Sequence, residues 1–355
     1  MKLLVLPGDG IGPEITEATV AVLDAVSERF GLGIAYEFRD IGFKTYETHG
    51  TTMPDGILAR AREVDGVILG PISHLHYPPR DKGGVNISAE FRVKLDLYAN
   101  IRPARTRAGV PHRGTAMDLV IMREATEGMY ADRNMFNGPG EFMPTEDIAL
   151  SIRKVTARAC ERIARASFAL ARRRRRKVTA VHKANVLVVT DGLFLREVRK
   201  VAAEYPDVAL DEVLMDAMAA HLVRDASRYD VICSTNFYAD ILSDLASELS
   251  GSLGLAGSIN AGDDLAAAQA QHGSAPDIAG QGKANPTSLI LSAAMLLTWI
   301  AEKRARPDLA EAAAAIEGAV DTALSMPETR TADLGGALAT AAYAGHLRDL
   351  IRDQA

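Results

Sequence analysis

The sequence predicts an α/β protein with a largely parallel sheet, because short apolar segments alternate with longer segments of helical periodicity. Residues 3–6 and 67–69 have the length and apolar character of buried strands. Pro13 opens a helix that extends to about Phe30, since proline in the first turn leaves no hydrogen bond unmade. At 355 residues, 48% of them hydrophobic, the chain is long enough for a large core divided between two lobes.

The remaining elements follow from the same periodicities. In chain order they are a strand at residues 34–38, a helix at 54–63, a loop or short hairpin at 135–144, an amphipathic segment at 149–170, a strand at 178–181, and two alanine-rich helices at 288–304 and 308–326. The basic run 172–177 follows the amphipathic segment, where positive charge complements the helix dipole. We therefore expect a solvated helix end there and no nucleic-acid patch, in keeping with the net charge of −6.

Cysteine content and hydropathy indicate the cellular compartment in which the protein is expected. Cys160 and Cys233 lack the spacing of metal ligands and lie in apolar surroundings, so they are expected to be reduced thiols of the core. The chain opens on a strand in place of a signal sequence, and no apolar run reaches the length of a membrane span. A cytoplasmic protein without membrane contact is the expectation.

Two carboxylates suggest a metal site. Asp240 and Asp244 stand at positions i and i+4 of a helical run, and Asp216 lies a short way upstream. Side chains with that spacing share one helix face, so Asp240 and Asp244 can converge on Mg²⁺ or Mn²⁺. The alternative is that they are ordinary solvated acids.

Three arginines stand beside apolar segments: Arg92, Arg102 and Arg123. An arginine at the end of a buried strand needs an anion, and its planar group suits a carboxylate. Together they predict a pocket for a small polycarboxylate. Tyr130, on a loop, and Lys183, after a strand, are acid/base candidates, although each alone is equally compatible with a surface residue.

Five segments in this order resemble the β-decarboxylating dehydrogenase family, which includes 3-isopropylmalate, isocitrate, homoisocitrate and tartrate dehydrogenases. They are residues 6–14, 97–103, 182–185, 240–244 and 272–280. The resemblance implies an isopropylmalate dehydrogenase-like fold of two α/β lobes, a large one from residues 1–97 plus 251–355 and a small central one from 98–250. It further implies a homodimer with shared active sites, in which an arm near residues 135–144 interlocks the subunits.

The resemblance also implies NAD-dependent oxidative decarboxylation of a 3-substituted malate with the help of a divalent metal. The arginines would hold the substrate carboxylates. Asp240 and Asp244 of one subunit and Asp216 of the other would hold the metal, with Asp216 also close to the substrate. Lys183, when neutral, would take the hydroxyl proton as a hydride passes to NAD⁺. After CO₂ leaves, Tyr130 would protonate the enol carbon.

The cofactor site is expected to be of a non-Rossmann type. The opening Gly8-Asp9-Gly10-Ile11-Gly12 lacks the G-x-G-x-x-G spacing. In similar proteins a later loop, at residues 273–285, wraps the adenosine. The cofactor-binding residues expected from the resemblance are Ile11, His272, Gly273, Ser274, Ala275, Asp277, Ile278 and Asn285. A carboxylate at Asp277 favours NAD over NADP, because it would repel a 2′-phosphate; the alternative is a helix cap before Ala279.

The substituent at C3 of the substrate stays open. Isopropylmalate enzymes carry leucines before the first arginine, whereas this chain has Asn86 and Ser88, which face the pocket or cap a helix. The expectation is therefore a 3-isopropylmalate dehydrogenase-like enzyme, with isocitrate/homoisocitrate or tartrate/D-malate dehydrogenases as alternatives. His74 and His76 replace a glycine-rich turn and are either substrate contacts or loop residues, and Ala239 replaces a glycine. A non-catalytic regulatory subunit is the alternative of another class.

Overall fold

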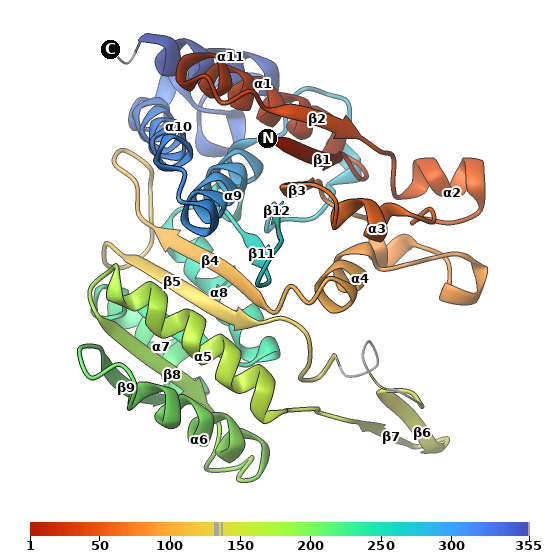
Figure 1. The fold of residues 1–355 in the computed structure, drawn as a ribbon, viewed down its shortest axis with the longest axis vertical. Helices are drawn as coiled ribbons and strands as arrows, with labels where there is room; N and C mark the ends of the chain where they lie inside the picture. The colour runs from red at the N-terminus through yellow and green to blue at the C-terminus, as the bar shows by residue number, and fades with distance from the viewer. Residues whose placement is uncertain (131–134, 136–137, 354–355) are drawn as a thin grey trace.

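A ten-stranded sheet extends through the molecule in a computed structural model that describes residues 1–130, 135 and 138–353 (Figure 1). Side by side, the strands are β2 (Ala35–Phe38), β1 (Lys2–Leu6), β3 (Gly66–Leu69), β12 (Ala266–Gln269), β11 (Ile259–Ala261), β4 (Ala99–Arg105), β5 (Asp118–Glu124), β10 (Val231–Ser234), β8 (Lys177–His182) and β9 (Ala209–Leu214). A separate hairpin pairs β6 (Glu141–Thr145) with β7 (Ile148–Ser151) and projects from the body of the molecule.

The sheet is parallel at both ends and antiparallel in the middle. The strands from β2 to β12 run parallel, as do those from β5 to β9. Between them, β11 pairs antiparallel with both of its neighbours, and β4 pairs antiparallel with β5. The predicted α/β class with a largely parallel sheet is confirmed. The division into lobes at 97/98 and 250/251 stays a prediction, because the sheet continues through the β11–β4 pair.

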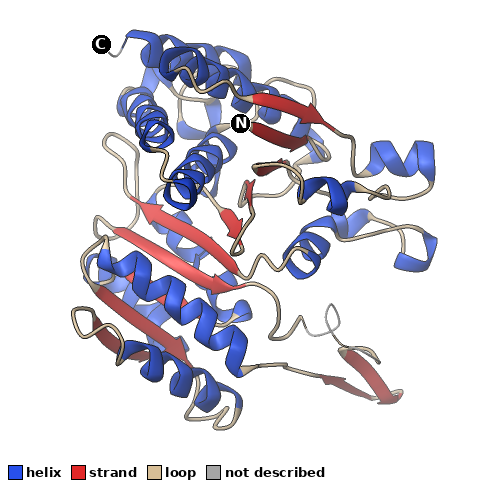
Figure 2. Ribbon diagram, viewed as in Figure 1, coloured by secondary structure: helices blue, strands red, loops and turns tan. Residues whose placement is uncertain are grey.

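Helices cover both faces of this sheet (Figure 2). They are α1 (Gly12–Phe30), α2 (Phe43–His49), α3 (Ile57–Ala61), α4 (Ile87–Lys94), α5 (Ala157–Arg172), α6 (Thr190–Ala202), α7 (Met215–Asp225), α8 (Asn236–Ser250), α9 (Thr287–Arg304), α10 (Pro307–Ser325) and α11 (Thr340–Asp353). In Figure 1, α5 and α6 lie in front of β8, while α7 and α8 lie behind it.

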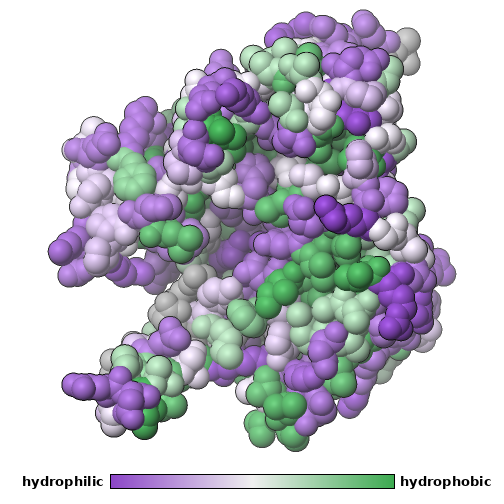
Figure 3. Space-filling model, turned by 180° about the vertical axis from the view of Figure 1, so that it is seen from behind, coloured by the Kyte–Doolittle hydropathy of each residue, from purple (hydrophilic) through white to green (hydrophobic). Residues whose placement is uncertain are grey.

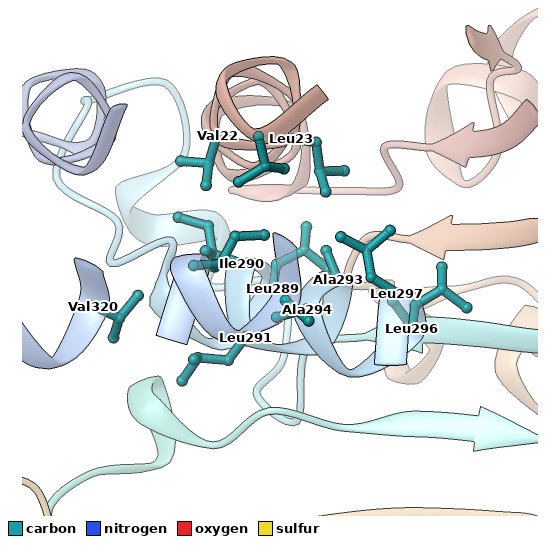
Figure 4. Packing of buried hydrophobic residues seen from close by; sticks show 14 of the residues in the cluster. Val22, Leu23, Leu289, Ile290, Leu291, Ala293, Ala294, Leu296, Leu297 and Val320 are labelled. Atoms are coloured by element: carbon teal, nitrogen blue, oxygen red, sulfur yellow. The ribbon is translucent and has the colours of Figure 1, made fainter. Parts of the chain in front are cut away.

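The largest hydrophobic cluster surrounds α9. Val22 and Leu23 of α1 face Leu289 and Ile290 of α9, and α10 contributes Val320 from the other side (Figure 4). Because neighbours surround α9, apolar side chains occupy most of its circumference. This cluster joins the first and last parts of the chain, so the strands β1 and β12 pack against the same hydrophobic core.

Two predicted elements need correction. The helix expected at 54–63 covers only Ile57–Ala61, because Gly56 before it adopts a left-handed backbone conformation (φ 86°) that no helix continues. The amphipathic segment expected from residue 149 becomes helical only at Ala157, where the Thr156 hydroxyl accepts a hydrogen bond from Ala159 N (3.2 Å). Residues 148–151 belong to β7 instead, so the expected loop or hairpin at 135–144 is a hairpin whose strands lie further along; residues 136 and 137 are outside the described part.

The basic run after α5 is neutralised by acids. Arg172 bonds Asp207 (2.6 Å), and Lys177 bonds Asp211 (2.6 Å). Cys160 and Cys233 are buried and free, as expected for core thiols. Of the helices that the structure describes, none combines the length and the apolar character that crossing a membrane requires.

Candidate active site

A pocket of about 300 Å³ opens where β3, β12 and β5 end. The carboxyl ends of parallel strands are the usual place for a ligand in an α/β sheet. The lining residues are Pro71, Ile72, His74, Asn86, Ser88, Ala89, Arg92, Arg102, Arg123, Tyr130, Asp240, Ser258, Gln269, Ala270, Gln271, His272 and Gly273. Segments from the beginning, middle and end of the sequence therefore meet at one cavity.

Asp240 is the centre of the charged wall. Arg102 Nη1 donates to Asp240 Oδ1 (3.1 Å), and Arg123 Nη1 donates to the same oxygen. Tyr130 OH donates to Asp240 Oδ2 (3.1 Å). Burial alone would raise the pKa of the Asp240 carboxyl, but the charges of Arg123, Arg102 and Arg92 outweigh it and lower that pKa. Asp240 is therefore an anion at neutral pH, and it satisfies arginines that the sequence assigned only to substrate.

An amide side chain fixes the orientation of each of the two arginines. Arg102 Nε donates to Asn100 Oδ1 (2.6 Å), and Arg123 Nε donates to Asn236 Oδ1 (2.8 Å). In the β4–β5 register Asn100 lies opposite Arg123, which brings the two guanidinium groups to one side. Burial and the neighbouring charge of Arg123 lower the pKa of Arg102 to about 10, so Arg102 is still a cation at neutral pH.

Asp244 joins the same wall. Its Oδ1 lies 3.5 Å from Arg102 Nη1 and accepts a hydrogen bond from Gln271 Nε2 (2.8 Å). The spacing of Asp240 and Asp244 thus places both carboxylates within reach of one guanidinium nitrogen, as expected for one face of α8. Their oxygens suit a hard divalent cation. Within the described part of one chain, however, no group of three or more His, Cys, Asp or Glu side chains could hold a metal.

Lys183 and Asp216 are paired with each other and do not line the pocket. Lys183 Nζ donates to Asp216 Oδ1 (2.7 Å), and this hydrogen bond lowers the pKa of Asp216. Within one chain Tyr130 therefore contacts Asp240, whereas Lys183, the other acid/base candidate, lies outside the pocket. Of the three expected metal carboxylates, Asp240 and Asp244 lie together, and Asp216 of the same chain is not with them.

Asn86 and Ser88 line the pocket, and each also has a structural partner. The Asn86 side chain caps α4 by accepting from Ala89 N (3.1 Å), while Ser88 Oγ accepts from Gln269 Nε2 (2.7 Å). Both interpretations of Asn86, pocket residue and helix cap, thus apply at once. His74 lines the pocket from the loop after β3, whereas His76 does not.

Two polar residues that the sequence did not predict support the pocket: Gln269 lines it, and Asn260 bonds two of the lining residues without lining it. Asn260 Nδ2 donates to Gln269 Oε1 (3.3 Å), and Arg92 Nε donates to Asn260 Oδ1 (2.9 Å). A continuous chain of hydrogen bonds therefore links Ser88 to Arg92 by way of two strands. A signal was present, since Gln269 is a lone polar residue at the end of the apolar segment Ala266–Gln269, as the arginines are in theirs.

The expected cofactor loop enters the pocket at His272 and Gly273. Burial lowers the pKa of His272, so its ring is neutral at physiological pH. Asp277 is exposed within a short 3₁₀ turn, Pro276–Ile278, whose N-cap is Ala275; the alternative role of Asp277 as a helix cap is therefore wrong. Asn285 bonds Asp333 (2.9 Å). Ala275 is half-buried, and Ile278 packs against the main core.

An α/β architecture with a polar, arginine-rich pocket at the end of a mostly parallel sheet is typical of α/β enzymes. A family model described as isocitrate/isopropylmalate dehydrogenase matches residues 2–347. The chain therefore belongs to the isocitrate/isopropylmalate dehydrogenase family, whose members are dehydrogenases that decarboxylate their substrates and typically depend on NAD and a divalent metal.

Individual relatives differ in their named substrates. The chain is 41% identical over 344 residues, 96% of both chains, to the isocitrate/homoisocitrate dehydrogenase of Thermus thermophilus. It is 38% identical over 351 residues, 99% of both, to the 3-isopropylmalate dehydrogenase of Archaeoglobus fulgidus. The crystal structure of isocitrate dehydrogenase from Methylococcus capsulatus matches with a TM-score of 0.88 at 39% identity, covering 99% of each chain.

Proposed function

We propose that this protein catalyses the NAD-dependent oxidative decarboxylation of a malate that bears a polar substituent at C3, in the manner of isocitrate or homoisocitrate. The observation that carries the proposal is a pocket lined by Arg92, Arg102 and Arg123 together with the polar residues Ser88 and Gln269. Ser88 and Gln269 already bond each other, but Ser88 Oγ is the acceptor in that bond, so its own hydrogen is not used there. A branched aliphatic group placed against Ser88 would exclude water without offering an acceptor to this hydrogen, at a cost of about 1–3 kcal/mol. A carboxylate or hydroxyl would accept it.

Asp240 and Asp244 would hold Mg²⁺ or Mn²⁺, with Asp216 of a second copy of this chain as the third carboxylate. A bound divalent cation supplies Lewis-acid polarisation of the substrate hydroxyl and carbonyl oxygens, and bound NAD⁺ supplies the hydride acceptor. Lys183 of the second copy would remove the proton from the C2 hydroxyl. Tyr130, already bonded to Asp240, would deliver a proton to C3 once CO₂ has left. The arginines would orient the carboxylates of the substrate.

A homodimer would bring these groups together. Exposed valines follow Lys183, namely Val186, Val188 and Val189, the last of them 84% exposed. Phe237 and Ile241 are exposed on α8. Figure 3, which views the molecule from behind, shows apolar side chains gathered on its lower half. Apolar surface of this kind favours coverage by another protein. The β6–β7 hairpin is exposed throughout, and a lone two-stranded hairpin is only marginally stable, so a second copy packed against it would account for both features.

The test is NADH production with Mn²⁺ across 3-isopropylmalate, isocitrate, homoisocitrate, D-malate and tartrate. We expect the highest kcat/KM with isocitrate or homoisocitrate, and Ser88→Leu should shift the preference toward 3-isopropylmalate. Ser325→Leu, at the exposed end of α10, is the matched control and should leave the preference unchanged. A wild-type preference for 3-isopropylmalate would contradict only the proposed polar substituent at C3. Absence of NADH with every compound would contradict the proposed reaction as well.

A further inference from the structure

The glycine-rich opening, residues 8–12, has no part in the chemistry described so far. The backbone N–H groups of Asp9, Ile11 and Gly12 are not available to a phosphate, because they already bond carbonyl oxygens of the protein. Asp9 N donates to Pro71 O (2.8 Å), and Ile11 N donates to Ser274 O (2.9 Å). Phosphate-binding turns leave such groups free for the ligand. The Ile11 side chain is itself in the core.

The glycines allow this close approach. A Cβ atom on Gly8 would lie 2.2 Å from Pro71 O, and one on Gly10 would lie 2.0 Å from Ser274 O. Real side chains do not tolerate such distances, and both residues also have positive φ angles of 77° and 59°. The opening therefore needs glycine at these positions so that both loops can contact the β1–α1 turn.

The Asp9 carboxylate binds the loop of residues 71–77 through buried hydrogen bonds. It is 6% exposed and accepts hydrogen bonds from Phe43 N (2.8 Å), from Ser73 N (2.9 Å) and from the Tyr77 hydroxyl. Bonds to a charged acceptor are stronger than those between neutral groups. Asp9 thus holds the loop 71–77 at two points and the start of α2 at a third.

A direct bond joins the two loops. Ser73 Oγ and Ser274 Oγ lie 2.7 Å apart, and both residues are buried. The loops then diverge into the pocket, which Ile72 and His74 line from one loop and His272 and Gly273 from the other. The spacing between these lining segments is consequently set by the contacts behind them.

We infer that Asp9 is a positioning residue, and that residues 8–12 with Ser73, Tyr77 and Ser274 form a joint that holds loops 71–77 and 272–285 at the separation NAD requires. Asp9 is not among the residues that line the pocket. It lowers the cost of ordering two loops when NAD binds, because both are fixed beforehand. The inference rests on the proposed use of NAD at this site, and it gives the glycine motif a purpose other than cofactor contact.

Tyr77→Phe is the first variant, since it removes one donor and leaves Asp9 its two backbone bonds. With the full-length protein and NADH as the probe, we expect the dissociation constant measured by nicotinamide fluorescence to rise about 3- to 10-fold. KM for NAD⁺ should rise in parallel, while kcat at saturating NAD⁺ and KM for the hydroxy acid stay within about twofold. Tyr46→Phe, on the nearby helix α2, is the control and should change none of these values.

Ser73→Ala, Ser274→Ala and the double variant then test the link between the loops. If one bond joins them, the double variant should weaken NADH binding little more than either single variant. Unchanged NADH binding in both Tyr77→Phe and Ser73→Ala, or additive effects of the two serines, would overturn the joint. Failure of the unmodified protein to bind NADH would instead overturn the proposed use of NAD, so the two failures are distinguishable.

Discussion

At the scale of the residue, Asp240 has a second role beside the one that its sequence spacing suggested. It is a candidate metal ligand, and it is also the anion that compensates two buried arginines, Arg102 and Arg123. A buried guanidinium without a partner is costly, so the carboxylate stabilises the pocket before any ligand binds. Substrate carboxylates and a cation would therefore enter a preorganised charge network.

Asp240→Asn should remove most of the activity. The amide keeps the shape and one acceptor oxygen but loses the charge, so metal affinity and the partnership with the arginines both weaken. We expect kcat to fall at least about 100-fold, by analogy with the loss of one preorganised electrostatic group. Steady-state assays at saturating Mn²⁺ provide the measurement. Asp349→Asn, exposed on α11, should behave as wild type; near-normal kcat in Asp240→Asn would place the metal elsewhere.

Glu127 should make stability depend on pH. Burial raises the pKa of this carboxyl to about 7, despite hydrogen bonds from Thr156 N and Oγ1. The folded state then holds a proton that the unfolded chain, with a pKa near 4.5, has released. Stability accordingly falls as pH rises from about 4.5 to about 7, by at most about 3 kcal/mol.

Urea unfolding at pH 5 and pH 8 would measure this loss. In Glu127→Gln the difference between the two pH values should shrink, whereas Glu311→Gln, exposed on α10, should retain it. An undiminished difference in Glu127→Gln would assign the pH dependence to other groups, of which the buried Glu124, with a pKa also raised by burial, is the nearest.

At the scale of the element, α4 combines structural contacts with the proposed substrate contacts within two turns. Asn86 caps it, Ser88 bonds Gln269, and Arg92 bonds Asn260, so one short helix presents three polar groups to the pocket. A helix of this length has little stability of its own and depends on its cap and its tertiary contacts. A change in the cap should therefore affect both stability and binding.

Two variants of Asn86 separate these effects. Asn86→Ala removes the cap and should lower the free energy of unfolding by about 1 kcal/mol. Asn86→Asp preserves the cap, so its stability should stay near that of wild type, while the added negative charge raises KM for a polycarboxylate. Urea unfolding and KM are measured on the same preparations. Equal destabilisation by Ala and Asp would show that the cap contributes little.

At the scale of the whole molecule, the proposed site is divided between two chains. One chain offers Asp240, Tyr130 and the arginines at the pocket, with Asp244 next to Arg102, while its own Lys183–Asp216 pair lies outside. A second copy contributing that pair would complete the metal ligands and the base. A monomer would then be inactive even when fully folded.

Mixed dimers would test this division. Lys183→Ala and Asp240→Asn should each be nearly inactive, but a dimer containing one of each would hold one site with both residues intact. After random exchange of subunits, about a quarter of wild-type activity should return. If each chain carried a complete site, the mixture would be as inactive as its components. Mixing two samples of Lys183→Ala is the control.

Local patterns in the sequence determined the α/β class, most element positions and the shared face of Asp240 and Asp244. These features depend on periodicity and on spacing within a few residues. The family resemblance came from five segments dispersed along the chain. The pairing of Arg102 with Asp240, the Ser88–Gln269 bond and the contact of Gly10 with Ser274 were decided only by the tertiary structure. Their partners are far apart in the chain, and the register and order of the strands bring them together. No local pattern encodes that register, because it results from packing the whole sheet against its helices.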